Sequence, residues 1–191
     1  NTSAFWARGL PLQSRQQKPS WQKTDVNKVG VIQFLVNGAP DLDAIYRLVR
    51  PNDNEFIVCD SFSGINVYGF YHPFNSQGTL WRHKYLPLAY LPTFCDFRMT
   101  DIWRGYICQH ILYQHGVGMR YEKPALYQNR NHHDIYQDYI GEHNGYVTTP
   151  ILLEILKSVK KAPFSDMLFE IYEKLIKIKL IADQRELRLL E

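Results

Sequence analysis

The clearest pattern of apolar positions lies near residue 30 of the chain. Residues 29–36 are almost all apolar or β-branched, and the Asn-Gly pair that follows them is a turn signal. This run predicts a mostly buried strand that ends in a turn. Directly after it, Pro40 and Asp41 predict the start of a helix, with Asp41 as the capping residue and the helix ending before Pro51.

Farther along, the apolar pattern is shorter and more interrupted. Residues 57–71 alternate in the manner of a strand. Residues 80–90 fit either a helix or a strand, but Leu-Pro pairs divide this region, because the residue before a proline is pushed out of the helical conformation. We therefore expect one strand-like segment followed by short pieces.

A longer helix is predicted to begin at Thr100 and to end at Gly116 or Gly118. Its apolar positions recur with helical spacing, and Thr100 is a suitable N-cap. Asp101 falls in the first turn, where the positive end of the helix dipole favours a carboxylate. The pattern thus places an acidic group at the start of a helix.

The last third of the chain consists of a polar stretch and a helical tail. Residues 121–144 are rich in Tyr, Asn and His without regular periodicity, which predicts a loop over the edge of the sheet. Thr149 and Pro150 predict the start of one helix, and Ser165 predicts the cap of a second. The tail is therefore expected to be two packed helices.

These elements predict an α/β fold in three parts. Residues 1–28 are expected to form an entry loop, residues 29–146 a domain of strands and helices, and residues 147–191 the helical tail. With 45% hydrophobic and 21% charged residues, the chain has the composition of a folded domain, and most of it is not expected to be disordered.

Charge and cysteine content exclude several classes of protein. The net charge is only +3, and outside the tail the Lys and Arg residues are scattered, so we expect no nucleic-acid partner. The three cysteines, Cys59, Cys95 and Cys108, form no CxxC pair, which excludes a zinc ribbon and indicates buried thiols. No apolar run of about 18 residues and no targeting signal occur in this chain. Because the first residue is not Met, we expect a fragment or a processed product.

Two clusters of residues carry the candidate chemistry. Residues 101–106 combine the Asp101 carboxylate, the Arg104 guanidinium and the Trp103 ring within one and a half helical turns, a set that could hold a polar ligand. The alternative is that Asp101 merely complements the helix dipole and Trp103 packs in the core. On the residues alone, both interpretations stay open.

The second cluster spans residues 129–134 and includes two adjacent histidines. An imidazole and a carboxylate here could complete a metal site or contact a diphosphate. Adjacent side chains in an extended segment point to opposite sides, so only one of His132 and His133 is expected to face a site, and both could be surface residues. The Asp41-Leu42-Asp43 triplet has the Asp-x-Asp form of a metal motif, but a capped helix already explains its carboxylates.

Several blocks of sequence carry a resemblance to a known family. In order along the chain they are Gly30-Val31-Ile32-Gln33, Asn37-Gly38-Ala39-Pro40-Asp41-Leu42-Asp43-Ala44-Ile45-Tyr46-Arg47-Leu48, Pro73-Phe74-Asn75-Ser76-Gln77-Gly78-Thr79-Leu80, Phe97-Arg98-Met99-Thr100-Asp101-Ile102-Trp103-Arg104-Gly105-Tyr106 and Tyr127-Gln128-Asn129-Arg130-Asn131-His132-His133. Together they resemble the STELLO-type glycosyltransferase family. The resemblance extends from about Trp6 to about His133, and the tail after Thr149 lies outside it.

The family is distantly similar to the reversibly glycosylated polypeptides, which are UDP-sugar mutases with a GT-A-like fold and a divalent metal. This similarity implies a nucleotide sugar, a glycan or protein acceptor, and Mn²⁺ or Mg²⁺. It also implies roles for individual residues. Asp101 is the expected catalytic residue, His133 the expected metal ligand, and the expected substrate-binding residues are Asn75, Ser76, Gln77, Trp103, Arg104 and Arg130.

The resemblance further implies a partial GT-A-like mixed sheet, the acceptor-side half of the fold, flanked by helices. We expect the nucleotide-binding strand and an acidic metal triplet to lie upstream, together with any membrane anchor. By resemblance the expected location is the Golgi or another endomembrane compartment. The alternative is a non-catalytic relative that binds glycans or meets a protein partner through the helical tail.

Overall fold

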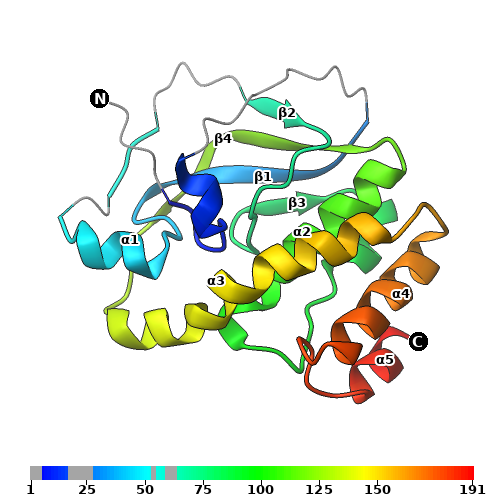
Figure 1. The fold of residues 1–191 in the computed structure, drawn as a ribbon. Coiled ribbons are helices and arrows are strands. Elements are labelled where there is room, and N and C mark those ends of the chain that lie inside the picture. The colour runs from blue at the N-terminus through cyan, green and yellow to red at the C-terminus, as the bar shows by residue number, and fades with distance from the viewer. Residues whose placement is uncertain (1–5, 17–27, 53–54, 59–63) are drawn as a thin grey trace.

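The fold is a four-stranded mixed sheet with its main helices packed below it (Figure 1). The computed structural model describes residues 6–16, 28–52, 55–58 and 64–191. The strands are β1 (Val29–Gly38), β2 (Ile65–Val67), β3 (Thr79–Trp81) and β4 (Gly118–Gln128), in the order β2-β4-β1-β3. β1 runs parallel to β4. β3 pairs antiparallel with β1, and β2 pairs antiparallel with β4. The predicted α/β class is therefore confirmed, and the GT-A-like arrangement stays a prediction.

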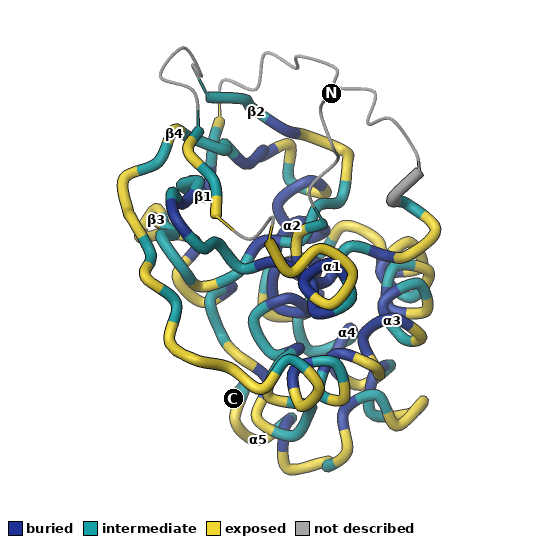
Figure 2. The backbone as a smooth tube through the Cα atoms, turned by 90° about the vertical axis from the view of Figure 1, so that its left-hand side faces the viewer, coloured by how far each residue is buried: buried dark blue, intermediate teal, exposed yellow. Residues whose placement is uncertain are grey.

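The most deeply buried helix is α2 (Thr100–Gln114), and the other helices lie around it. The helices are α1 (Ala44–Val49), α2, α3 (Ile135–Ser158), α4 (Phe164–Lys177) and α5 (Arg185–Leu190), with 3-10 turns η1 (Leu12–Gln16), η2 (His83–Ala89) and η3 (Phe97–Met99). Every residue of α2 from Ile102 to Tyr113 is buried. Figure 2 shows the buried stretches gathered in the interior. Fully burying one large apolar side chain stabilises the fold by about 1.5–3 kcal/mol, so α2 is the main source of core stability.

Two elements predicted from periodicity are confirmed, with corrections at two caps, because Thr100 is the first residue of its helix and Met99 occupies the N-cap position. The strand at residues 29–36 is β1, and the helix at Thr100 is α2 with Asp101 in its first turn. The helix after β1 ends before Pro51 as expected, but Asp41 does not cap it. Asp43 does, accepting a hydrogen bond from the Tyr46 backbone N at 3.2 Å. Asp41 instead pairs with an arginine, a long-range contact that local capping rules do not anticipate.

The loop predicted for residues 121–144 is wrong. β4 extends to Gln128 because β1 lies beside it and pairs with it along its length. α3 then begins at Ile135, capped by the Asp134 side chain, and continues through Thr149 and Pro150, which do not start a helix. The predicted division between residues 146 and 147 thus falls inside α3, and the tail contains its last turns followed by α4 and α5.

The remaining expectations concern short segments and cysteines. Among the described residues of the strand predicted across 57–71, only those of β2 form a strand, whereas residues 80–90 form short pieces as expected. Cys108 is buried and Cys95 is partly buried. Cys59 and residues 1–5 and 17–27 of the predicted entry loop lie outside the described residues. Among the helices of the described segments, none is long and apolar enough to cross a membrane.

Candidate functional site

The Arg8 guanidinium joins two carboxylates from distant parts of the chain. Its Nε donates to Asp41 Oδ2 at 2.8 Å, and its Nη2 donates to Asp101 Oδ1 and Oδ2 at 3.0 and 3.1 Å. The side chains are only 8%, 15% and 17% exposed for Arg8, Asp41 and Asp101. Because charges removed from water require partners, this triad fixes the N-terminal segment against the start of α2.

Local chain geometry explains how Arg8 reaches the start of α2. The Asp43 backbone N donates to Trp6 O at 2.9 Å, and the Tyr106 hydroxyl donates to Gly9 O at 3.0 Å. Gly9 has φ +84°, and a Cβ there would lie 2.2 Å from a methyl of Ile102. Glycine is therefore required for the chain to lie flat against α2 and present the preceding arginine.

The loop between residues 73 and 79 closes the other side of the triad. The Asn75 side-chain amide donates to Asp41 Oδ2 at 3.0 Å, and the Ser76 backbone N donates to Asp101 Oδ2 at 3.2 Å. The Gln33 side chain on β1 donates to Gln77 O at 2.6 Å. Two of the predicted substrate-binding residues, Asn75 and Ser76, thus each contact one of the carboxylates, and Gln77 follows them in the same loop.

Arg104 contacts this loop from α2. Its guanidinium is stacked 4.8 Å from the ring centroid of Phe74 and 5.0 Å from that of Trp81, and it donates to Ser76 Oγ at 3.1 Å. The residue is only 3% exposed, and burial lowers its pKa. The neighbouring Trp103 is 2% exposed and belongs to the core, so its position gives no support to a contact with substrate.

A cleft of about 140 Å³ opens beside the triad. Its polar lining residues are Arg8, Gln33, Asp41, Asn75, Gln77 and Tyr121. Asp101 is not one of the described residues that line this cleft. Burial alone would raise the pKa of Asp41, but the charge of Arg8 and hydrogen bonds from Arg8 and Asn75 outweigh this and lower it from 3.8 to about 2. The carboxylate that reaches the cleft is therefore ionised at neutral pH.

Arg130 lies at the edge of this site. Its Nη1 donates to Pro40 O at 2.8 Å, and its Nη2 is 3.5 Å from Asp41 Oδ1. Its Nε is buried without a hydrogen-bond partner in the structure. Burial, followed by repulsion from Arg47 and Arg98, lowers the pKa of Arg130. This guanidinium therefore has spare donor capacity in a strongly positive environment.

His133 belongs to a second, adjoining cluster. Asp138 accepts a hydrogen bond from Arg47 and forms an ion pair with Arg98. Arg98 also forms an ion pair with Glu142. His133 Nδ1 lies 3.5 Å from Asp138 Oδ2, and its side chain is 38% exposed. The backbone carbonyl of Arg98 accepts from Arg8, which connects the two clusters.

No cluster of potential metal ligands accompanies His133 in the described part of the chain. Within the described ranges, no three His, Cys, Asp or Glu residues lie together as potential ligands. The carboxylate next to His133 is already neutralised by two guanidinium groups, an arrangement that suits an anion better than a cation. His133 as a metal ligand stays a prediction, without support from this geometry.

The structure gathers most of the predicted residues and adds two that sequence reasoning missed. Asn75 contacts Asp41, and Ser76 contacts Asp101 and Arg104. Gln77 contacts Asn75, and Arg130 lies at the edge, whereas His133 and Trp103 lie apart. The missed residues are Arg8 and, in its ion-pairing role, Asp41. Arg8 falls in a segment without apolar periodicity, so no local signal identified it.

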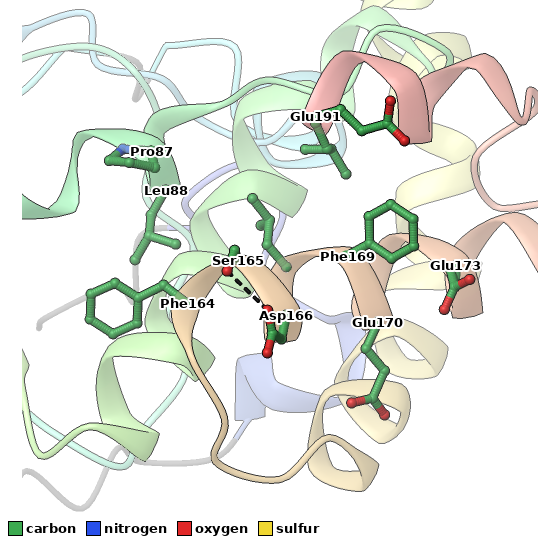
Figure 3. A pocket seen from close by; sticks show the side chains of 11 residues that line it. Pro87, Leu88, Phe164, Ser165, Asp166, Phe169, Glu170, Glu173 and Glu191 are labelled. Atoms are coloured by element: carbon green, nitrogen blue, oxygen red, sulfur yellow. Dashed lines mark hydrogen bonds between the residues drawn. The ribbon is translucent and has the colours of Figure 1, made fainter.

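A larger cavity lies elsewhere and differs in character. It has a volume of about 530 Å³ and lies between η2, α4 and α5 (Figure 3). Leu88, Phe164 and Phe169 line it together with carboxylates that include Glu170 and Glu173. Because negative side chains repel phosphate, this cavity does not suit a nucleotide sugar.

Comparison with known proteins identifies the class. Residues 98–191 match the family model of the STELLO glycosyltransferases, whereas no curated protein matches the chain. The match supports a glycosyltransferase as the class of protein to which this α/β region and its polar cleft belong. More narrowly, it confirms the STELLO-type resemblance over residues 98–191. The matched residues include α2, β4 and the entire helical tail, so the tail belongs to the family region although the sequence resemblance stopped before it.

Proposed function

We propose that this chain is part of a glycosyltransferase that uses a nucleotide sugar of the UDP-sugar class, and that the cleft beside Arg8 holds the sugar. The observation that carries the proposal is a small concave surface lined by polar side chains that are already oriented. Asp41, Asn75 and Gln77 are held by one another and by their neighbours before any ligand arrives. Such preorganisation reduces the entropy lost on binding.

The size of the cleft limits what it can hold. Pockets for whole small molecules occupy about 300–1,000 Å³. The 140 Å³ cleft is smaller and fits one portion of a nucleotide sugar. Carboxylate and amide groups match the donors and acceptors of sugar hydroxyls, and Asp41, with its pKa lowered to about 2, accepts from them as an anion.

Arg8 and Arg130 supply positive charge where the diphosphate would lie. Guanidinium groups bind phosphate oxygens through paired hydrogen bonds, and Arg130 has a buried Nε without a partner. During transfer, the acceptor hydroxyl oxygen forms a bond to the sugar carbon while the bond from that carbon to the diphosphate breaks. Fixed guanidinium groups stabilise the charge that develops on the departing diphosphate.

The acceptor hydroxyl must also lose its proton, and Asp101 is the proposed base. Asp41 is unsuitable because a group with a pKa of about 2 is a weak base at neutral pH. Asp101 accepts from the Ser76 backbone N and from Arg8. An acceptor hydroxyl replacing the Ser76 contact would bring its proton to Asp101, which at the same time positions Arg8.

Calorimetric titration with UDP-glucose, with and without Mn²⁺, tests the proposal. We expect Arg130→Gln to weaken binding about tenfold or more, since charged hydrogen bonds contribute about 1.5–3 kcal/mol. Arg188→Gln, at an exposed position outside the cleft, is the matched control and should bind as the parent chain does. Absence of UDP-glucose binding under both metal conditions, or equal effects of the two variants, would overturn the proposal.

The role of Asp101 requires a separate measurement of turnover in the complete enzyme. Asp101→Asn should abolish transfer while the dissociation constant for UDP-glucose changes little. If the residue only positions Arg8, binding and turnover should weaken together. Unchanged turnover would remove Asp101 from the mechanism.

A second candidate function is binding of a protein partner at the apolar cavity between η2, α4 and α5. Its rim carries Asp166, Glu170 and Glu173, so the occupant that fits is a segment with one large apolar side chain between basic residues. Figure 3 shows Phe164 and Phe169 beside this acidic rim. A Lys-Leu-Lys peptide is the probe, and Glu170→Gln with Glu173→Gln should weaken its binding. Equal binding of an Asp-Leu-Asp peptide would exclude this function.

A further inference from the structure

A separate cavity of about 350 Å³ lies at the opposite end of β1 from the sugar cleft. It is formed where the start of β1, the start of η2 and the turn after α2 meet. The residues that line it are Lys28, Val29, Arg82, Lys84, Tyr85, His115, Val117 and Phe164. We refer to this set as the basic cavity.

The basic cavity contains three cations, Lys28, Arg82 and Lys84. In the described part of the chain they have no carboxylate partner, and the described lining contains no Asp or Glu. This differs from the sugar cleft, where Arg8 and Arg130 each lie against an acidic group. Three like charges around one concave surface repel each other and create a positive potential that attracts an anion. The charge pattern therefore favours an anionic ligand.

Backbone hydrogen bonds hold these cations on rigid elements. The Arg82 backbone N donates to Gly30 O at 3.1 Å, and the Gly118 backbone N donates to Lys28 O at 2.8 Å. The Tyr85 backbone N donates to Arg82 O at 2.8 Å at the start of η2. The main-chain positions of the charged residues are thus fixed by the sheet, which favours binding because little backbone entropy is lost.

Aromatic rings form the floor of the cavity. The ring centroids of Tyr85 and Phe164 are 5.7 Å apart, and the His115 ring contacts Phe164 edge-on at 4.4 Å. Lys84 Nζ lies 5.7 and 5.9 Å from the Tyr85 and Phe164 rings. His115 Nε2 is 2.9 Å from Ala162 O, which can only accept, so this nitrogen carries a proton. A ligand with an apolar ring face would find flat partners here.

We propose that the basic cavity binds a phosphate monoester carried on a ring, with the phosphate between the cations and the ring against Tyr85 and Phe164. On β1, Val29 lines the basic cavity and Phe34 lines the sugar cleft. These two residues are five positions apart, and a strand rises about 3.3 Å per residue, so the two cavities are about 17 Å apart along β1. The basic cavity is therefore a second site, and it does not depend on the function proposed for the cleft.

Amide chemical-shift mapping on the whole chain tests this site, with glucose 6-phosphate as the probe and glucose and inorganic phosphate as comparisons. We expect glucose 6-phosphate to shift the amides of Val29, Lys84 and Val117, and glucose to leave them unchanged. Inorganic phosphate should shift the same amides at higher concentration, because it lacks the ring. Since exposed charge pairs contribute about 0.2–1 kcal/mol, each cation should account for about a 1.5- to 5-fold change in affinity, smaller at high salt.

Two triple variants with the same change in net charge provide the control. Lys28→Gln, Arg82→Gln and Lys84→Gln together should weaken binding of glucose 6-phosphate about 3- to 100-fold, the product of the three single effects. The matched variant carries Gln at three exposed positions outside the cavities, Lys177, Lys179 and Arg188. Equal losses in the two variants, shifts confined to residues of the sugar cleft, or glucose binding as tightly as its phosphate would each overturn the proposal. Equal losses in the two variants leave the UDP-glucose test of the cleft unaffected, so failure of this proposal and failure of the proposed function are distinguishable.

Discussion

Replacing Arg8 by Met is the most informative single perturbation of the site. Methionine keeps much of the volume of arginine but removes its charge and every hydrogen bond. In the parent chain Arg8 satisfies Asp41 and Asp101, which are 15% and 17% exposed. The variant therefore leaves two nearly buried carboxylates without their main partner, and at neutral pH both would remain in a poorly solvated environment.

The magnitude follows from burial and from the pKa of Asp41. The shift from 3.8 to about 2 corresponds to about 2 kcal/mol of stabilisation of the ionised form of Asp41. Asp101 loses a comparable contact, and removing one partner of a buried ion pair costs about 3–5 kcal/mol. We therefore expect Arg8→Met to lower the free energy of unfolding at pH 7 by about 3–5 kcal/mol.

The effect should depend on pH in a definite direction. Asp41 has a lowered pKa in the folded chain, so its contribution is present above the pKa of the unfolded state, near 3.9, and is lost as the pH falls toward 2. The parent chain should therefore lose this contribution between about pH 4 and pH 2. Without Arg8 the carboxylate has no such advantage, and the difference between the two proteins should shrink as the pH is lowered.

Urea unfolding followed by circular dichroism at pH 7 and at several values below pH 5 measures both quantities. Arg188→Met, an exposed substitution, is the control and should change stability by no more than about 0.5 kcal/mol. A loss of less than about 1 kcal/mol for Arg8→Met at pH 7, or a difference that grows toward acid pH, would refute the interpretation of Arg8 as a buried bridge.

Three further substitutions test the supports of the site and of the fold by urea unfolding. Arg104→Lys should cost about 1–2 kcal/mol because an ammonium cannot stack flat on two rings, and unchanged stability would contradict that role. Gly105→Ala should cost about 1–3 kcal/mol, since its Cβ would lie 2.6 Å from the carbonyl oxygen of Phe74, and unchanged stability would contradict this close approach. Glu186→Gln should cost about 1–3 kcal/mol because the buried carboxylate accepts from a tyrosine hydroxyl and two backbone N–H groups, and a loss below about 0.5 kcal/mol would show that these bonds contribute little.

Elements with a strong local pattern were predictable from the sequence, and elements stabilised by distant partners were not. β1 and α2 have continuous apolar or helical periodicity and lie where that periodicity predicts. β4 has a polar, tyrosine-rich sequence and becomes a strand because β1 pairs with it. The Thr149-Pro150 pair predicts a helix start, but α3 accommodates Pro150 in its interior. Tertiary contacts overrode local propensity in both cases.

The candidate site followed the same division. Asp101 was identified by its place at the start of a helix, and residues 75–77 were indicated by family resemblance. Arg8 was missed because its role depends on carboxylates 33 and 93 residues away along the chain. Asp41 was assigned to a local cap, although the neighbouring Asp43 provides it. Ion pairs of this sequence separation have no periodic signature, so only the folded arrangement identifies them.

Mapping UDP-glucose onto the chain by side-chain amide NMR is the most direct test of the proposed sugar cleft. The side-chain amides of Gln33, Asn75 and Gln77 line that cleft and should shift together on titration with UDP-glucose. UDP alone should shift them less, because it lacks the sugar. Saturable binding of UDP-glucose that leaves these three amides unchanged would contradict the assignment of the cleft as the sugar site.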